Sequence, residues 1–319
     1  AAATAIKVSG KVIDPSKVTK EDVIGAVDPS TGAETGAQVI RQVYPRLGIV
    51  PGLILAPGWS QIPEVGLALA AKAAKINGVY SAMALLDLDT AKAKKYTDTK
   101  SVKEESGYTS PFCYPLWPCD RVGEYILAKS AVAGAMIQYM ASDNEDVPNQ
   151  SPSNHLLGVG GQCLEDGTEV YLDQDQANTV NGYGVTTAIN QNGYRLWGNY
   201  TGAYPASSDA KDIWFAVRRM FSWQGNNFIQ TYFDEVDDPM NNVLVQSVVD
   251  SENIRCSAYA PKYWAGASIE YKSDDNPKTA ILAGTMKFRQ HIAPYTPAQE
   301  IVDIIDYDTD TLAAAVGGN

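Results

Sequence analysis

The chain is poor in the side chains that enzymes use for acid–base and nucleophilic catalysis. Its 319 residues include only two histidines, His155 and His291. A Ser-His-Asp triad needs an imidazole to take the proton of its serine. His155 lies in a polar segment and His291 in a segment with the pattern of a strand, so we expect hydrogen-bonded structural roles for both. The sequence also lacks a G-x-S-x-G nucleophile elbow and a Walker-type phosphate loop, and it therefore predicts no catalytic residue.

Two further patterns resemble ligand-binding motifs but lack decisive positions. The segment 158–161, GVGG, lacks the third glycine of a dinucleotide-binding fingerprint, and no clear strand leads into it. The segment 306–310, DYDTD, resembles the start of a calcium-binding loop. Its sixth position is Thr311 instead of glycine, and its twelfth is Gly317 instead of glutamate. We therefore expect no cofactor and no metal ion, and we interpret the aspartates as a solvated acidic segment.

Composition excludes several classes of partner. The formal net charge of −12 and the pI near 4.6 argue against nucleic-acid binding, because phosphate contacts need a basic face. No run of roughly 18 apolar residues occurs, so direct membrane insertion is not expected. The four cysteines are scattered, with no C-x-x-C pair. They predict buried free thiols and synthesis in a reducing cytoplasm.

The first two thirds of the chain have an α/β pattern. The segment 52–56 is an uninterrupted apolar run, as in a strand that is buried on both faces of a parallel sheet. An Ala- and Leu-rich helix is expected over 65–76, after Pro63 at its start, and a second buried strand over 81–87. Strand, helix and strand form a βαβ unit. A third strand is expected within 112–117.

The period changes after Pro205. Two long helical stretches, 212–235 and 240–251, precede strands near 266–273 and 284–293, which is an α+β pattern. Between these strands we expect Asn276 to cap a short helix. The predicted organisation is an N-terminal segment 1–34, an α/β domain 35–204 and a C-terminal α+β domain 205–319.

The chain ends in an apolar segment that follows a proline-rich hinge. The hinge contains Pro294, Thr296 and Pro297. The segment consists of Glu300, Ile301, Val302, Asp303, Ile304, Ile305, Asp306 and Tyr307. Its isoleucines would also line one face of a helix, but the β-branched and aromatic residues favour a strand. Such a strand either folds back onto its own domain or adds to the sheet of another copy. The residues alone leave both alternatives open.

Several motifs along the chain resemble the tail sheath proteins of contractile bacteriophages. Related sheaths occur in R-type bacteriocins and other contractile injection systems. The motifs with this resemblance run in order from about residue 35 to about residue 310, and they are LAPGWS (55–60), GYRLWGN (193–199), Tyr204-Pro205, VRRMFSW (217–223), VDDP (236–239) and APYTPAQEI (293–301).

The resemblance implies a fold and a way of assembling. Residues 35–204 would form the subtilisin-like, doubly wound α/β domain of the sheath without its catalytic triad. Residues 205–319 would form the C-terminal sheath domain that faces the tail tube. In this family, terminal arms of neighbouring subunits add strands to the C-terminal domain, which implies that Glu300–Tyr307 is donated. Residues 1–34 are short and polar for a complete N-terminal arm and outer domain, so they are interpreted as a partial region.

The resemblance also implies the function. The chain would be a structural subunit of a sheath that polymerises helically around the tail tube and contracts to drive the tube through the host envelope. Its partners would be copies of itself, the tail tube protein, and baseplate and tail terminator proteins, within a virion assembled in the bacterial cytoplasm. No nucleotide would be needed. The alternatives are a static virion or receptor-binding module and a cryptic α/β hydrolase.

Two adjacent arginines are candidates for contacts beyond the subunit. Arg218 and Arg219 lie on the first long helix of the second half. We expect ion pairs with another subunit or with the tube, and the alternative is a salt bridge within the domain or a solvated face.

Overall fold

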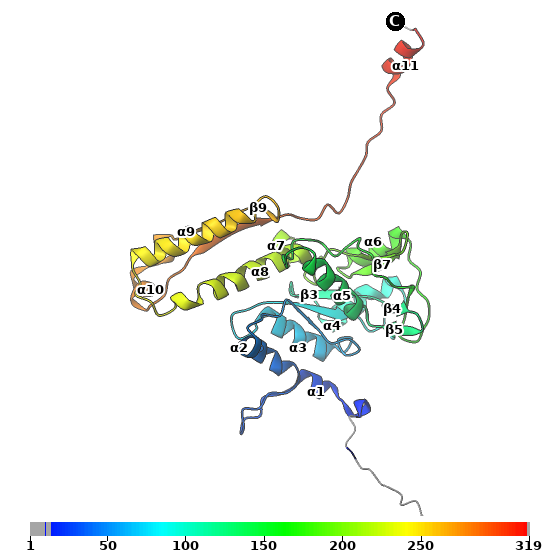
Figure 1. Ribbon diagram of the computed structural model, residues 1–319. Coiled ribbons are helices and arrows are strands. Elements are labelled where there is room, and N and C mark those ends of the chain that lie inside the picture. The colour runs from blue at the N-terminus through cyan, green and yellow to red at the C-terminus, as the bar shows by residue number, and fades with distance from the viewer. Residues whose placement is uncertain (1–9, 11–13, 318–319) are drawn as a thin grey trace, which may run out of the picture.

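The structure is a computed structural model that describes residue 10 and residues 14–317. It has a compact α/β body, an elongated extension formed by two helices and a hairpin, and a C-terminal arm that projects away from both (Figure 1). The predicted N-terminal segment 1–34 lies partly outside the described residues. Its described part contains a short 3-10 helix, η1 (Pro15–Lys17), and α1 (Lys20–Ile24). Helix α1 begins with a capping box at its N-cap residue, Thr19.

The centre of the body is a parallel sheet with the order β1 (Leu53–Leu55), β2 (Met83–Asp87) and β3 (Cys113–Leu116). Every residue of β2 is buried. Because side chains alternate along a strand, Ala84 and Leu86 enter one core, and Met83 and Leu85 enter the other. The predicted βαβ unit and the predicted third strand are confirmed.

One helix covers each face of this sheet. Helix α3 (Pro63–Ala74) begins at Pro63, as predicted, and it packs Val65 and Leu69 into the first core. Helix α5 (Lys129–Ser142) packs Ala133 and Ile137 into the second core. The chain therefore buries both faces of its central strand with its own helices, which is the arrangement that continuous apolar strands need.

Smaller elements complete the body. Before β1 lie η2 (Gly36–Gln42) and α2 (Val43–Leu47), and before β3 lie η3 (Tyr96–Asp98) and α4 (Thr99–Ser106). An antiparallel sheet has the order β5 (Tyr125–Leu127), β4 (Cys119–Val122), β6 (Gly161–Cys163). Helix α6 (Gln174–Gly182) is capped by Asp173 and precedes the hairpin of β7 (Thr187–Asn190) and β8 (Tyr194–Trp197). A parallel bridge between Leu116 and Thr186 connects β3 with the residue before this hairpin.

The extension contains long helices followed by strands. Its helices are α7 (Ala210–Ile213), α8 (Phe215–Thr231), η4 (Phe233–Glu235) and α9 (Asn242–Ala258). The two strands, β9 (Trp264–Glu270) and β10 (Arg289–Pro294), pair antiparallel. Between them lie η5 (Ser273–Asp275) and α10 (Lys278–Leu282). The predicted cap is wrong: Pro277 occupies the N-cap of α10, while the Asn276 amide bridges the backbone of Lys272 and Lys287.

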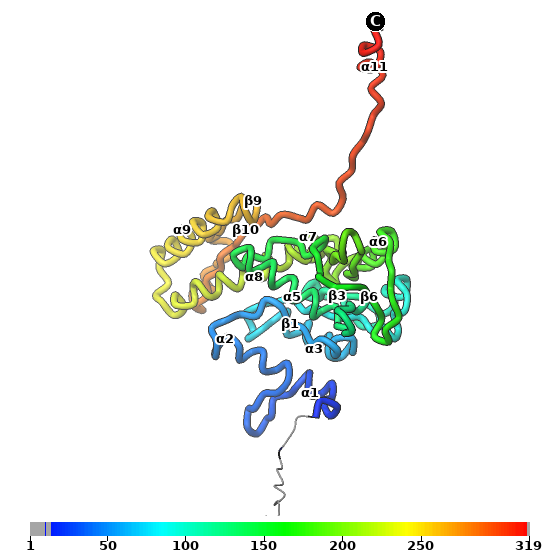
Figure 2. Tube along the Cα trace, turned by 45° about the vertical axis from the view of Figure 1, so that its right-hand side comes forward, coloured from blue at the N-terminus to red at the C-terminus, as the bar shows by residue number. Residues whose placement is uncertain are grey.

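The C-terminal arm has no strand in the single chain. Residues 300–307 carry no secondary structure, and α11 (Thr309–Ala315) follows them. The arm leaves the junction of body and extension and runs away from both (Figure 2). The physical reason is that a strand exists only when its backbone groups pair with a neighbour, and residues 300–307 pair with no strand of the described chain.

Candidate assembly surfaces

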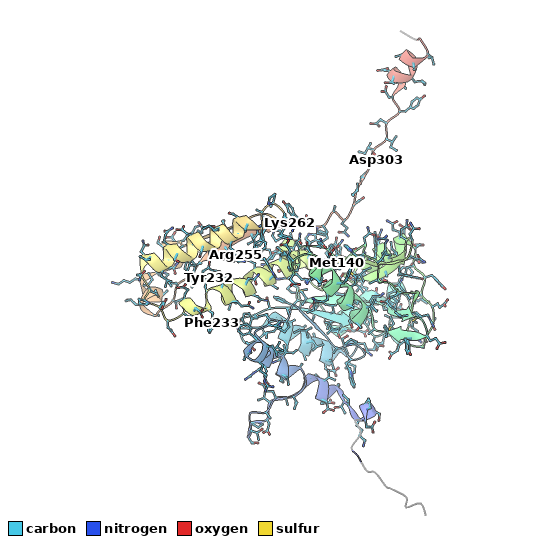
Figure 3. The ribbon with its side chains drawn as sticks, in the orientation of Figure 1. Met140, Tyr232, Phe233, Arg255, Lys262 and Asp303 are labelled. Carbon is cyan, nitrogen blue, oxygen red and sulfur yellow. The ribbon has the colours of Figure 1, made fainter. Side chains whose placement is uncertain are left out.

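The arm exposes an apolar surface that the rest of the chain does not cover. Ile301, Ile304 and Ile305 are 89%, 80% and 86% exposed, and Val302 and Tyr307 are also exposed. Asp303 stands on the same stretch, away from the body (Figure 3). Scattered single apolar residues are normal on a protein surface, but a run of them marks a site of interaction. In the single chain this apolar stretch therefore remains uncovered, and its donation to another copy stays a prediction.

The root of the arm is fixed at both ends. The Tyr295 hydroxyl donates a hydrogen bond of 2.9 Å to the Pro261 carbonyl, and the Tyr200 hydroxyl donates one of 2.7 Å to Gln299 Oε1. Tyr200 is itself held by stacking on Tyr204, with ring centroids 3.7 Å apart. The predicted hinge residues Pro294, Thr296 and Pro297 lie at or between these two anchors. Free movement of the arm therefore starts after Gln299, and the hinge role of the prolines stays a prediction.

The extension contains a sheet that is small enough to accept another strand. Among residues 14–317, no third strand pairs with β9 or β10. Trp264 and Ile269 of β9 are buried, whereas exposed and half-buried residues alternate along β10. An open groove of about 450 Å³ runs over residues 265–268 and 291–293. The sheet packs against α8 and α9 through Trp264, Met220 and Cys256, and an added strand would extend it by main-chain pairing.

A buried polar network holds the helices of the extension against this sheet. Glu252 is fully buried and accepts hydrogen bonds from Gln224 (2.6 Å), Gln290 (2.9 Å) and Arg255 (2.6 Å). Tyr232 donates a further bond of 3.2 Å. These side chains come from α8, α9 and β10, and Figure 3 shows Arg255 and Tyr232 between the two helices. A buried carboxylate that loses a hydrogen-bond partner costs free energy, so the network stabilises the contact between these elements.

Helix α8 belongs to both parts of the molecule. Phe215, near its start, packs in the core of the body, and Met220 packs in the core of the extension. Farther along α8, the Asn226 side chain accepts from the Ser81 amide at 2.9 Å and donates to the Ser81 carbonyl at 2.7 Å. These bonds connect residues 145 positions apart. The helix therefore joins the two parts rigidly.

The two candidate arginines have different surroundings. Arg218 pairs with Asp212 at 3.2 Å and lies over the ring of Phe112, so its contacts are within the chain. Arg219 lies over the ring of Phe215, 5.5 Å from its centroid, and forms no ion pair among the described residues. The structure thus supports the intramolecular alternative for Arg218 and leaves Arg219 without a charged partner.

Neither histidine takes part in a catalytic arrangement. His291 Nε2 lies 2.9 Å from Glu270 Oε1, across the β9–β10 ladder. Burial lowers the pKa of His155, with a smaller contribution from Arg195. Within the part of the chain that the structure describes, no group of His, Cys, Asp or Glu side chains has the geometry to hold a metal ion.

Sequence reasoning missed a buried polar cluster at the end of β2. Asp87 accepts from the Ser130 amide (2.8 Å), the Ser130 hydroxyl (2.5 Å) and the Ser60 hydroxyl (2.9 Å). Burial raises the pKa of Asp87. Nearby, Lys129 and Asp120 form an ion pair that is fully buried. The signal was the aspartate that ends an otherwise apolar strand. Its partners are distant in the sequence, because Ser60 lies in a turn before α3 and Ser130 in the first turn of α5.

Comparison with known proteins identifies several that are similar to this chain. No family model matches the chain. It is 26% identical over 334 residues to the tail sheath protein of Burkholderia phage BcepMu, covering 99% of this chain and 68% of that protein. It is 24% identical over 294 residues to the tail sheath protein of Escherichia phage P2, covering 89% of this chain and 69% of that protein. The resemblance to contractile tail sheath proteins that the sequence motifs indicated is thus confirmed.

A solved sheath has the same fold. The sheath complex of an extracellular contractile injection system, PVC, in its contracted state superposes with a TM-score of 0.67 at 18% identity. The match covers 87% of this chain and 76% of that one. This chain therefore shares a mixed α/β fold with that sheath structure. The chain spans between 48% and 69% of the length of the curated sheath relatives that it matches.

The helices give no indication of a membrane span. None of those in the described part of the chain combines the length and the apolar character that crossing a bilayer requires.

Proposed function

We propose that this sheath subunit polymerises helically around a tail tube by donating its C-terminal arm to the next copy. The observation that carries the proposal is the exposed apolar stretch Glu300–Tyr307, beside a two-stranded sheet with unpaired edges. Strand addition supplies directional main-chain hydrogen bonds, and the groove over β9 and β10 supplies contacts for alternate side chains. The likeness to phage tail sheath proteins supports the same assignment.

The geometry of donation predicts a helical polymer. Donor and acceptor are different surfaces of one chain, so the contact is head-to-tail. A head-to-tail contact that does not close produces a helix instead of a ring. The predicted hinge, with Pro294, Thr296 and Pro297, would let successive subunits rotate while the donated strand stays in place. Because hydrogen bonds at Tyr295 and Gln299 fix this segment in the single chain, these two bonds would have to open before the hinge could bend.

We assign three regions to the chain. Residues 1–34 would be a partial N-terminal region, 35–204 a subtilisin-like doubly wound α/β domain, and 205–319 the C-terminal sheath domain with its exchange strand. The parallel sheet between α3 and α5 supports the α/β assignment. We propose that this domain is not an enzyme, and the likeness to structural tail sheath proteins supports this. Within the third region, Glu300–Tyr307 would be the strand that is donated to another copy.

Contraction would be a rotation of rigid subunits into a shorter and wider lattice. The Glu252 network and the Asn226–Ser81 bonds would keep each subunit intact during this rotation. The free energy would come from new contacts between subunits, so no nucleotide or other cofactor is needed. The partners would be other copies, the tail tube, the baseplate and the tail terminator, with no nucleic acid and no direct membrane insertion. The particle would be assembled in the bacterial cytoplasm.

Deletion of residues 300–319 tests this proposal. The shortened chain should remain a folded, soluble monomer, because the arm contributes nothing to either core. Negative-stain microscopy and sedimentation should show tubes or sheets for the full chain and none for the shortened one. The control is Val243→Asp, which changes an equally exposed apolar residue on α9, outside the arm.

A mixing experiment sharpens the test. A chain without the arm can accept a strand but cannot donate one, so it should end a polymer at one side. Small amounts of it, added to full-length protein, should shorten the tubes in proportion to the dose. Tubes formed by the shortened chain alone would contradict the proposal.

A further inference from the structure

Arg219 is a cation that lacks a counterion. Its side chain is half-buried on α8 against the ring of Phe215. Burial lowers the pKa of Arg219 to about 10, so the guanidinium is still charged at neutral pH. Placing a charge in such surroundings is costly unless an opposite charge and hydrogen bonds accompany it. Among the described residues, no carboxylate forms an ion pair with the Arg219 guanidinium.

The guanidinium lines an open cleft between α8, α5 and the outer edge of β1. The cleft has a volume of about 760 Å³. Leu53, Met83 and Trp223 contribute apolar walls. The Ser222 hydroxyl, which also lines the cleft, is buried without a hydrogen-bond partner. The one acidic residue of the lining, Asp146, forms no ion pair with Arg219. A volume within roughly 300–1,000 Å³, apolar walls and a few convergent polar groups are typical of a binding site.

The C-terminal end of the same chain has acidic side chains without neighbouring cations in the described part of the chain. Its last twenty residues include five acidic side chains and no basic one. Helix α11 lies within this segment, and all of its residues are exposed. Leu312 of the helix is 49% exposed, and Val316, directly after the helix, is 79% exposed. Asp308 is occupied in capping this helix through Thr311, which leaves Asp310 of the first turn without a partner among the described residues. A helix of this length is marginal in water without packing.

We propose that α11 of a second copy docks in the Arg219 cleft, with the carboxylate of Asp310 paired to the Arg219 guanidinium. This proposal rests on the proposed function, because it follows the donated arm beyond its strand. An arginine and a carboxylate form paired hydrogen bonds of high specificity, and Leu312 would cover the apolar wall of the cleft. We assign the acceptor to another copy because the arm carries α11 away from the body and the extension of its own chain (Figures 1 and 2).

Two truncations separate this inference from the proposed function. Removing residues 308–319 leaves the exchange strand intact, so tubes should still form, at a critical concentration raised about tenfold. Removing residues 300–319 should abolish tubes. If the shorter truncation leaves the critical concentration unchanged, the docking of α11 is wrong and strand exchange stands. If the longer truncation still yields tubes, the proposed function is wrong.

Charge reversal tests the ion pair itself. Asp310→Arg lies on the exposed arm and cannot disturb the subunit fold, and it should raise the critical concentration about tenfold. Arg219→Glu should do the same, and the double variant should restore assembly towards the original value. Lys278→Glu, on an exposed lysine of α10, is the charge-matched control and should have no such effect. A double variant that assembles no better than Asp310→Arg would overturn the pairing.

Cross-linking between copies gives an independent readout. Asn227 lines the cleft and Leu312 lies on α11. Chains with Asn227→Cys and chains with Leu312→Cys, mixed before assembly, should yield a cross-linked pair under mild oxidation. Neither chain alone should yield that pair. Absence of the mixed product in assembled tubes would contradict the proposal.

Discussion

The central sheet of the body and the β9–β10 sheet of the extension are completed by different means. Strand β2 lies between two parallel neighbours and under two helices, and all five of its residues are buried. Strands β9 and β10 have only each other, and the arm that follows β10 exposes its isoleucines. The body thus satisfies its backbone and apolar groups within one chain, whereas the end of the chain leaves both unsatisfied. Substitutions in the body should therefore act on folding, and substitutions in the arm on assembly.

The largest effect is expected at the buried ion pair of the body. Lys129→Ala leaves Asp120 buried without its cation and should lower the free energy of unfolding by about 3–5 kcal/mol. Urea unfolding of the monomer measures this loss. The double variant Lys129→Met with Asp120→Leu should recover most of it, because an apolar pair needs no counterion. An equally unstable double variant would show that the site depends on more than charge.

Two substitutions that shorten an apolar side chain test the difference between the body and the arm directly. Leu85→Ala, in β2, should cost about 2–5 kcal/mol of stability because it leaves a cavity in a fully buried core. Ile304→Ala, in the arm, should change the stability of the monomer by less than about 0.5 kcal/mol, since the side chain has no packing partner in the single chain. Thermal unfolding and sedimentation, run on both variants, should show opposite patterns. Loss of monomer stability in Ile304→Ala would break the distinction.

A pH-dependent effect is expected at Lys103, which joins α4 to the loop before β7. Its ammonium group donates to the carbonyls of Tyr183 (2.9 Å) and Tyr204 (2.5 Å). Burial lowers the pKa of Lys103 to about 8 from 10.5. Between these values the unfolded chain binds a proton that the folded chain has lost, so stability should rise with pH, by on the order of 3 kcal/mol.

Lys103→Met removes this titration and should flatten the rise. Chemical unfolding at pH 7, 8.5 and 10 measures the slope, and the difference between the two proteins cancels the titration of all other groups. A variant with the same slope as the original protein would contradict the assignment.

The smallest effect is expected at the root of the arm. Tyr200→Phe removes the hydrogen bond to Gln299 but keeps the stacking on Tyr204, so stability should change by about 0.5–1.5 kcal/mol at most. Backbone hydrogen exchange over residues 296–301 should increase, while exchange in β2 should stay the same. Unchanged exchange at the root would show that Tyr295 alone fixes the arm.

Local patterns in the sequence predicted the central elements of the body. Apolar runs predicted the buried strands β1 and β2, and Pro63 marked the start of α3. These inferences succeeded because each depends on residues within a few positions of one another.

Sequence reasoning failed or remained open where the deciding contact was distant. Asn276 looks like a helix cap, but its amide bridges two backbone segments that only the fold brings together. Arg218 and Arg219 are indistinguishable in the sequence, yet only one has an aspartate beside it. The segment 300–307 has the composition of a strand, and in a single chain it is none, because β structure needs a partner.

The sequence by itself determined the composition of the arm, the order of the elements and the absence of catalytic motifs. The tertiary structure decided which surfaces remain uncovered: the edges of β9 and β10, the cleft at Arg219 and the whole arm. The physical reason is that periodicity and capping are local properties of a chain. Exposure and charge compensation depend on which distant segments meet in space.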